Sequence, residues 1–144
     1  MNNLYGQPYS KIEDTDVIEE QQVVLQQKFP HYFEGLIIDS LYIINSKLSK
    51  LSYVKDDVYH EAIINRDVDD LMIVAIAAEL PREGVPEVIL NALKDSDYGE
   101  SEVLNFYYVT IPYQEDFYAF DIAENGGFDR VFFNDLGVLQ ADPY

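Results

Sequence analysis

The 144-residue chain has no cysteine and few basic residues. Without cysteine, no disulfide can form and no thiolate can serve as a nucleophile, so nothing marks the chain as built for an oxidising compartment. The first residues, MNNLYGQPYSKIEDTD, have no basic stretch followed by an apolar one. No uncharged apolar run approaches the roughly 18 residues of a membrane-spanning helix. From these absences we expect a cytoplasmic protein.

The shortage of basic residues leaves a strongly acidic chain, with 9 Lys and Arg against 27 Asp and Glu and a net charge of −18. Such a charge repels nucleic-acid phosphates and anionic membranes, and it attracts basic proteins or cations over a Debye length of about 10 Å. We therefore expect a basic protein as the partner. The last 50 residues hold 11 of the acidic residues, only one arginine, and 12 of the 20 Tyr and Phe residues. Acidic and aromatic side chains are thus concentrated near the C-terminus.

Motifs of catalysis and of cofactor binding are missing. His60-Glu61 is not followed by the second histidine of a zinc-protease helix, and His31 lies far away in the sequence. There is no Gly-x-Ser-x-Gly elbow, and Gly126-Gly127 lacks the Lys-Ser/Thr of a phosphate-binding loop. The acids of 67–70 lack the glycine and distal glutamate of a calcium loop. We expect no enzymatic activity, no metal and no cofactor.

Residues 101–138 are predicted to form an antiparallel β-meander, because β-branched and aromatic residues alternate there with period two. Turns are expected through 112–116 and at Gly126-Gly127. With those two glycines at the hairpin tip, the predicted cross-strand pairs are Phe120 with Phe133, Ile122 with Val131 and Glu124 with Asp129. The preceding hairpin would place Tyr108 near Phe120 and Phe106 near Ile122.

Alternation divides the meander into two faces. The face expected in the core comprises Leu104, Phe106, Tyr108, Tyr118, Phe120, Ile122, Val131 and Phe133. The opposite face mixes aromatic and acidic side chains, a combination suited to an interface that is wet when free and covered when bound. The alternative is a second layer of helices or loops over it. This face comprises Asn105, Tyr107, Val109, Phe117, Ala119, Asp121, Arg130 and Phe132.

The N-terminal half is predicted to be mainly helical. Asp16 and Glu19 match a capping box at the start of a helix that Pro30 ends. Six apolar residues then follow at spacings of three and four, which predicts a central helix, namely Phe33, Ile37, Leu41, Ile44, Leu48 and Leu51.

Three shorter segments precede the meander. Residues 52–65 fit either a hairpin about Asp56-Asp57 or a helix, and we favour extended structure. Asp67 can cap a helix that begins at Val68, with a buried strand over 71–77 as the competing assignment, and Pro81 ends either one. Pro86 indicates a further helix start.

Together these elements predict an α+β fold, with N-terminal helices packed on a C-terminal antiparallel β-meander. Residues 1–14 are expected to form an N-terminal arm and 15–144 a single domain.

The partner-binding residues predicted from this scheme lie in or beside the meander. Glu124 and Asp129 would form a like-charge pair at a hairpin mouth, which is either simply solvated or a binding site for a cation or for a partner's Arg or Lys. The predicted set is Tyr107, Tyr113, Glu115, Asp116, Phe117, Asp121, Glu124, Asp129, Phe132 and Asp135.

In its small size, acidity, lack of cysteine and tyrosine content, the chain resembles the immunity proteins that bacteria pair with secreted or contact-dependent toxins. The resemblance implies an inhibitory protein that neutralises a basic toxin, most plausibly a nuclease, by protein–protein association. The alternatives are a phage-type nucleic-acid mimic directed against a host defence enzyme, and an acidic accessory subunit of a larger complex.

Overall fold

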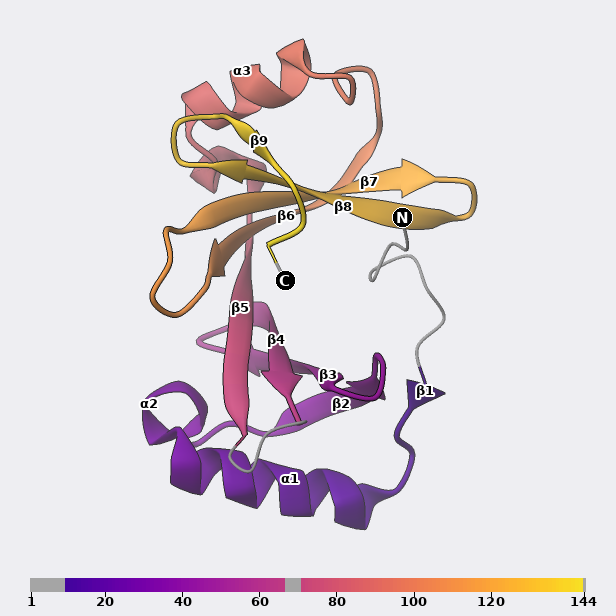
Figure 1. The fold of residues 1–144 in the computed structure, drawn as a ribbon, viewed down its shortest axis with the longest axis vertical. Helices are drawn as coiled ribbons and strands as arrows, with labels where there is room; N and C mark the ends of the chain where they lie inside the picture. The colour runs from indigo at the N-terminus through magenta and orange to yellow at the C-terminus, as the bar shows by residue number, and fades with distance from the viewer. Residues whose placement is uncertain (1–9, 67–70, 144) are drawn as a thin grey trace. The chain divides into compact units, whose positions relative to one another are not determined.

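The computed structural model describes residues 10–66 and 71–143. Within these ranges the chain divides into two compact units, which we call the N-terminal unit (10–76) and the C-terminal unit (77–143). The described residues contain nine strands, which are ordered in the sheet as they are in the sequence (Figure 1). The predicted fold of N-terminal helices on a C-terminal meander is therefore wrong, because the N-terminal unit is itself built mainly of strands.

The predicted arm and domain map onto these units as follows. Residues 1–9 lie outside the described residues. Ser10–Lys11 form β1, which pairs with the end of β2, and the N–H of Ile12 donates to the carbonyl of Leu41 at 2.8 Å. The predicted domain, 15–144, is made up of parts of both units.

In the N-terminal unit, four strands follow the helices. β2 (Ile38–Ile43), β3 (Leu48–Lys55) and β4 (Val58–Asn65) form consecutive antiparallel hairpins, and β5 (Met72–Leu80) runs on into the C-terminal unit. Asp56 and Asp57 form the β3–β4 turn with φ of 52° and 63°. The extended structure favoured for 52–65 is confirmed.

The predicted central helix over 33–51 is instead the end of α2 (Pro30–Phe33), strand β2 and the first half of β3. Gly35 adopts a φ of +74° just after α2. In the next turn, the side-chain oxygen Oδ1 of Asn45 accepts from the backbone N–H groups of Lys47 and Leu48 at 2.8 Å. Strands buried on both faces are apolar almost continuously, so they also satisfy helical spacing.

The helix predicted from Val68 to Pro81 is wrong as well, because Met72–Leu80 form β5, as the competing assignment had it. A short apolar run cannot be assigned to helix or strand by periodicity alone. Asp67, Asp69 and Asp70, expected to cap or start that helix, lie outside the described residues.

Helix α1 (Thr15–Lys28) covers the sheet of the N-terminal unit. Its cap is Asp14 rather than Asp16, since the Asp14 carboxylate accepts from the Asp16 N–H at 2.9 Å. Leu25 is fully buried under the helix. The core that it joins contains Phe33, Ile38, Leu41, Leu51, Tyr53, Ala62, Ile64 and Ile73.

Two glutamines of α1 also contact the backbone at the start of β2. The Ile38 N–H donates to Gln22 Oε1 and Gln26 Nε2 donates to the Leu36 carbonyl, both at 2.8 Å. Gln22 and Gln26 are one helical turn apart, so they lie on the same face of α1, and their backbone partners are two residues apart. The two side chains therefore pair with the N–H of Ile38 and the carbonyl of Leu36, as the backbone of a neighbouring strand would.

The C-terminal unit contains the predicted meander. After a 3₁₀ turn (Arg82–Gly84), α3 (Glu87–Asp95) starts beyond Pro86 as expected, followed by β6 (Val103–Thr110), β7 (Phe117–Glu124), β8 (Gly127–Asn134) and β9 (Leu139–Gln140). Helix α3 packs on one face of these strands (Figure 1). The core between them comprises Val85, Ile89, Leu93, Phe120, Ile122, Val131 and Phe133.

The predicted strand register was wrong by two residues. The β7–β8 turn is Asn125-Gly126, with φ of 41° and 83°, so Phe120 pairs with Val131 and Tyr118 with Phe133. Asn-Gly is the preferred sequence for such a two-residue turn. A shift of two leaves each side chain on its predicted face.

The β6–β7 pairs shift likewise, to Phe106 with Phe120 and Tyr108 with Tyr118. One residue of the predicted core face is exposed. An irregularity between Val103 and Asn105 leaves Leu104 46% exposed and places Val103 against the core.

Candidate protein-binding surface

Four of the predicted partner-binding residues are buried. Tyr107, Phe117, Asp121 and Phe132 retain 4, 5, 1 and 1% of their surface, so they offer no accessible interface in this structure. The face that carries them was expected to be either a partner interface or a covered layer, and it is covered. Sequence could not decide between the two because this face carries both charge and aromatic rings.

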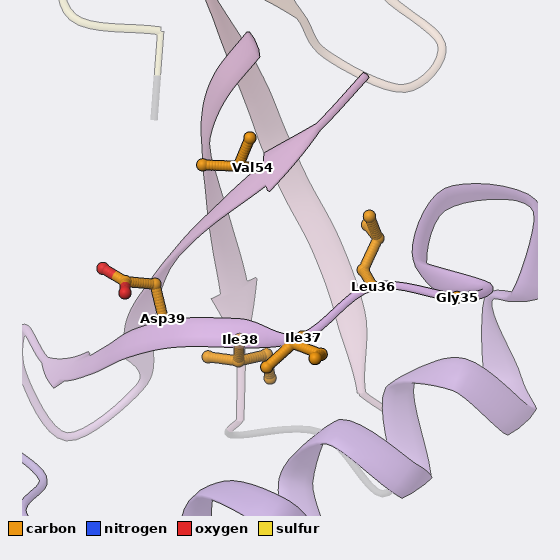
Figure 2. Close-up of a pocket in the computed structure, with 6 residues that line it drawn as sticks. All are labelled: Gly35, Leu36, Ile37, Ile38, Asp39 and Val54. Atoms are coloured by element: carbon orange, nitrogen blue, oxygen red, sulfur yellow. The ribbon is translucent and has the colours of Figure 1, made fainter. Parts of the chain in front are cut away.

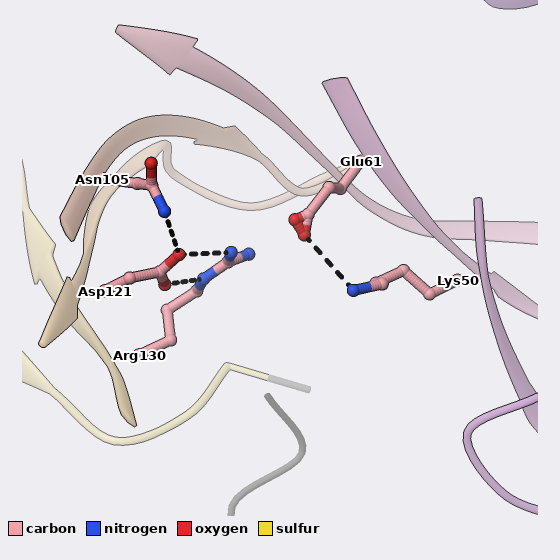
Figure 3. A network of polar contacts seen from close by, with 5 residues as sticks. All are labelled: Lys50, Glu61, Asn105, Asp121 and Arg130. Atoms are coloured by element: carbon pink, nitrogen blue, oxygen red, sulfur yellow. Dashed lines mark hydrogen bonds and ion pairs between the residues drawn. The ribbon is translucent and has the colours of Figure 1, made fainter. Parts of the chain in front are cut away.

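The charge on this face is neutralised internally. Arg130, directly opposite Asp121 in the β7–β8 pair, donates through Nε to Oδ1 at 2.7 Å and through Nη2 to Oδ2 at 3.1 Å (Figure 3). Asn105 Nδ2 donates to the same Oδ2 at 3.2 Å, and the guanidinium lies 4.2 Å from the centre of the Tyr107 ring. Asp121 is therefore a structural carboxylate.

The N-terminal unit has a charge pair of its own. Lys50 Nζ lies 3.7 Å from Glu61 Oε1 (Figure 3) and 5.1 Å from the centre of the Tyr42 ring. Both charged side chains are largely buried. This pair, like that of Asp121, is satisfied within the fold and is not presented to a partner.

Four other predicted residues gather at one end of the meander. Phe117 pairs with Asn134, so the β6–β7 turn and the β8–β9 turn leave the sheet at the same end (Figure 1). These turns carry the residues that we call the turn surface, namely Tyr113, Glu115, Asp116, Asp135 and Leu136. All of them are exposed except Asp116, which is half-buried.

The turn surface is electrostatically coupled to the strands below it. The Tyr108 hydroxyl donates to the Asp116 carboxylate. That hydrogen bond, followed by desolvation and by the negative charges of Asp116 and Asp135, raises the pKa of Tyr108 to about 12.

The last two predicted residues lie at the other end of the meander. Strand β7 runs from Phe117 to Glu124, which separates its ends by about 23 Å at 3.3 Å per residue. Asp129 pairs with Ile122 rather than with Glu124. Burial and then the Glu124 charge raise the pKa of Asp129, so the two carboxylates do interact unfavourably. The predicted set therefore does not form one surface.

Tyr113 is the most exposed large side chain of the turn surface, with a relative exposure of 106%. It follows Pro112 in a turn closed by a 3.1 Å hydrogen bond from the Gln114 N–H to the Ile111 carbonyl, and its φ is +64°. This position of a turn normally requires glycine or asparagine. The strained backbone could not be read from the sequence, although Pro112 indicated a turn.

Leu136 is the one residue of the turn surface that was not predicted. It is 75% exposed on a turn that Asn134 holds, since Asn134 Oδ1 accepts from the N–H groups of Leu136 and Val138 at 3.0 and 2.9 Å. Gly137, at φ +84°, fits against α3, where a Cβ would lie 3.1 Å from that of Ala92. The sequence Asn-Asp-Leu-Gly at 134–137 could have indicated this turn, because asparagine and glycine are common in tight turns.

The N-terminal unit has a shallow apolar hollow beside the start of β2 (Figure 2). Its volume is about 430 Å³, and Ile37 and Val54 at its border are 77% and 57% exposed. Asp39 is the one charged residue among the described residues that line the hollow. The hollow contains no arrangement of acid, base and nucleophile that indicates chemistry. It is lined by Gly35, Leu36, Ile37, Ile38, Asp39 and Val54.

The described residues do not bring together three potential metal ligands. His60 stacks on Tyr53 with ring centres 5.2 Å apart, and its Nδ1 lies 2.8 Å from the Val58 carbonyl, so its role is structural. Within the described parts of the chain, no helix is long and apolar enough to cross a membrane.

Comparison with known proteins defines the fold class. No protein-family model and no curated protein matches the chain. A BLIP-like protein from Bacteroides fragilis is similar, with a TM-score of 0.57, 16% identity and 89% of each chain covered. A DUF2874 family protein from Bacteroides uniformis is similar with a TM-score of 0.58, 15% identity and 82% of each chain covered. At these identities the likeness shows a shared, BLIP-like fold.

A third similar structure bears on location. It comes from Bacteroides eggerthii, is described as one of the "putative periplasmic proteins", and matches with a TM-score of 0.59, 15% identity and 83% of each chain covered. This finding goes against the cytoplasmic location expected from the sequence, and we withdraw that expectation. The absences on which it rested, of cysteine and of a leader-like segment, are weak evidence of compartment.

Proposed function

We propose that the protein is an inhibitory binding protein that neutralises a basic protein through its turn surface. The observation that carries the proposal is Tyr113, a fully exposed aromatic ring at the end of the meander that also carries the exposed carboxylates of Glu115 and Asp135. Tyrosine is enriched among the residues that dominate binding energy, and flanking carboxylates favour a positively charged partner.

The charge of the whole chain supports this class of partner. A net charge of −18 steers a basic protein toward the surface and repels nucleic acid and acidic proteins. Among basic proteins, a nuclease toxin fits best, because it must present Lys and Arg to phosphates and those residues would accept the carboxylates. The proposal thus retains the immunity role that the sequence suggested, on a smaller part of the predicted surface together with Leu136.

The test begins with capture of partners from an extract of the encoding bacterium on the immobilised chain. The captured protein is identified by mass spectrometry, purified, and titrated against three forms of the chain by calorimetry. We expect Glu115→Lys/Asp135→Lys to weaken binding at least tenfold, because it reverses the charges at the interface. The matched control, Glu100→Lys/Glu102→Lys, makes the same change of net charge on exposed residues away from the turn surface.

Two results would reject the proposal. One is the capture of no basic protein by the unmodified chain. The other is equal weakening by both double variants, which would mean that net charge alone, and not the turn surface, attracts the partner.

A further inference from the structure

We propose that Tyr113 acts as a wedge that enters a pocket in the cationic site of the basic partner, so that the partner is blocked directly. This inference rests on the proposed function and names how the turn surface would perform it. The reason begins with the backbone. A φ of +64° is unfavourable for tyrosine, whereas glycine or asparagine would form the same turn without strain.

The Tyr113 ring gains no packing within the described chain that would offset this strain. Its side chain is completely exposed, so it covers no core residue of the described chain. Strained residues of this kind persist where the surroundings hold them, and they concentrate at functional positions. An exposed aromatic ring at a strained position is therefore best explained by contact with a binding partner.

The base of the turn is rigid. Ile111, just before the turn, is 5% exposed and anchors it in the protein. On the following side, Asp116 is held by the Tyr108 hydroxyl, and the Tyr108 and Tyr118 rings meet edge to face with centres 5.4 Å apart. A ring presented on a rigid support loses little entropy when it binds, which favours high affinity.

The shape and charge of the turn define the complementary site. A ring at the tip of a turn is convex, so its partner surface must be concave. A tyrosine offers an apolar body and a negative ring face, which suits a pocket lined by apolar groups and a Lys or Arg. Glu115 and Asp135 would meet further cations at the rim. An apolar pocket bordered by Lys and Arg is the chemistry of a cleft that binds nucleic acid.

The experiment uses the basic protein captured by the unmodified chain and three variants. Tyr113→Gly removes the ring and the strain, and we expect at least about a 30-fold loss of affinity with no loss of thermal stability. Tyr113→Phe retains the ring and should stay within about fivefold of the unmodified chain. Tyr32→Ala removes another exposed aromatic, on α2, and should leave affinity unchanged.

A second measurement tests whether blocking is direct. Heparin, a polyanion, serves as the probe of the partner's cationic site. We expect heparin and the chain to exclude one another, so that adding heparin releases the bound chain and no ternary complex forms in sedimentation velocity. A ternary complex would overturn direct blocking.

The outcomes separate this inference from the proposed function. If Tyr113→Gly binds as tightly as the unmodified chain while Glu115→Lys/Asp135→Lys does not, the wedge is rejected and the turn surface remains the interface. If the unmodified chain captures no basic protein, both proposals are rejected. Loss of affinity in Tyr113→Gly together with mutual exclusion by heparin would support the wedge.

Discussion

Arg130 and Asp121 form a buried, two-pronged ion pair directly across strands β7 and β8, with N–O distances of 2.7 and 3.1 Å. We expect Asp121→Leu or Arg130→Met to destabilise the protein by about 3–5 kcal/mol, because each leaves an uncompensated buried charge. The double variant removes both charges and should be more stable than either single variant.

Urea unfolding followed by circular dichroism checks this prediction, with Glu102→Gln as the exposed-carboxylate control. If a single variant does not fold, recovery of folding in the double variant gives the same information. A double variant less stable than both single variants would contradict the account.

The Asn125-Gly126 turn leads to a second prediction. Gly126 has a φ of +83°, and a Cβ added there would meet no atom within 4 Å, so Gly126→Ala introduces backbone strain and no clash. We expect a loss of about 1 kcal/mol in the free energy of unfolding. Gly84→Ala is the control, since its Cβ would make ordinary contacts of 3.5 Å or more and its φ is not in the left-handed region. Equal effects in the urea midpoints would refute the prediction.

The same turn shows what sequence could and could not predict in the C-terminal unit. Placing the tip at Gly126-Gly127 instead of Asn125-Gly126 moved every cross-strand partner by two residues. Faces repeat with period two, so Phe120, Ile122, Val131 and Phe133 were nevertheless assigned correctly to the core.

In the N-terminal unit, sequence failed for a different physical reason. Strands β2 and β3 carry apolar residues on both faces, and that pattern satisfies helical spacing as well as strand burial. The turn at Asn45 and the left-handed conformation of Gly35 exclude one long helix. Each depends on a single residue, so neither outweighs a periodic pattern of many residues in the sequence.

The candidate surface was only partly predictable. Alternation assigned Tyr107, Asp121 and Phe132 to a common face, but it cannot show whether a face is covered. Tyr113, Glu115 and Asp135 form one end of the meander because of the strand register, which depends on the turns.

Two of the glutamines of α1, Gln22 and Gln26, give a third prediction. Gln22→Ala and Gln26→Ala each remove the partner of a half-buried backbone group at the start of β2, and we expect each to destabilise the protein by about 1–2 kcal/mol. Gln27→Ala is the matched control, because Gln27 is an exposed glutamine on the same helix. Thermal unfolding by calorimetry measures all three. Indistinguishable melting temperatures would show that water replaces these hydrogen bonds at no cost.

Tyr108 gives a prediction of pH dependence. Its pKa is raised from 10 to about 12, first by the hydrogen bond to Asp116 and then by desolvation and neighbouring negative charge. The folded state therefore favours the neutral phenol more than the unfolded state does. The stability that this difference provides is fully present below about pH 10, and it is lost as the pH rises through 12.

Substitution of Tyr108 tests that sign. In Tyr108→Phe, ultraviolet titration near 295 nm should lose one phenol from those that ionise near pH 12. The stability gap between Tyr108→Phe and the unmodified chain should also narrow between pH 10 and pH 12, because only the unmodified chain loses the Tyr108 contribution there. Tyr53→Phe is the contrasting variant, since burial alone raises the pKa of Tyr53 to about 12. A gap that stays constant up to pH 12 would mean that the hydrogen bond to Asp116 does not couple the ionisation of Tyr108 to folding.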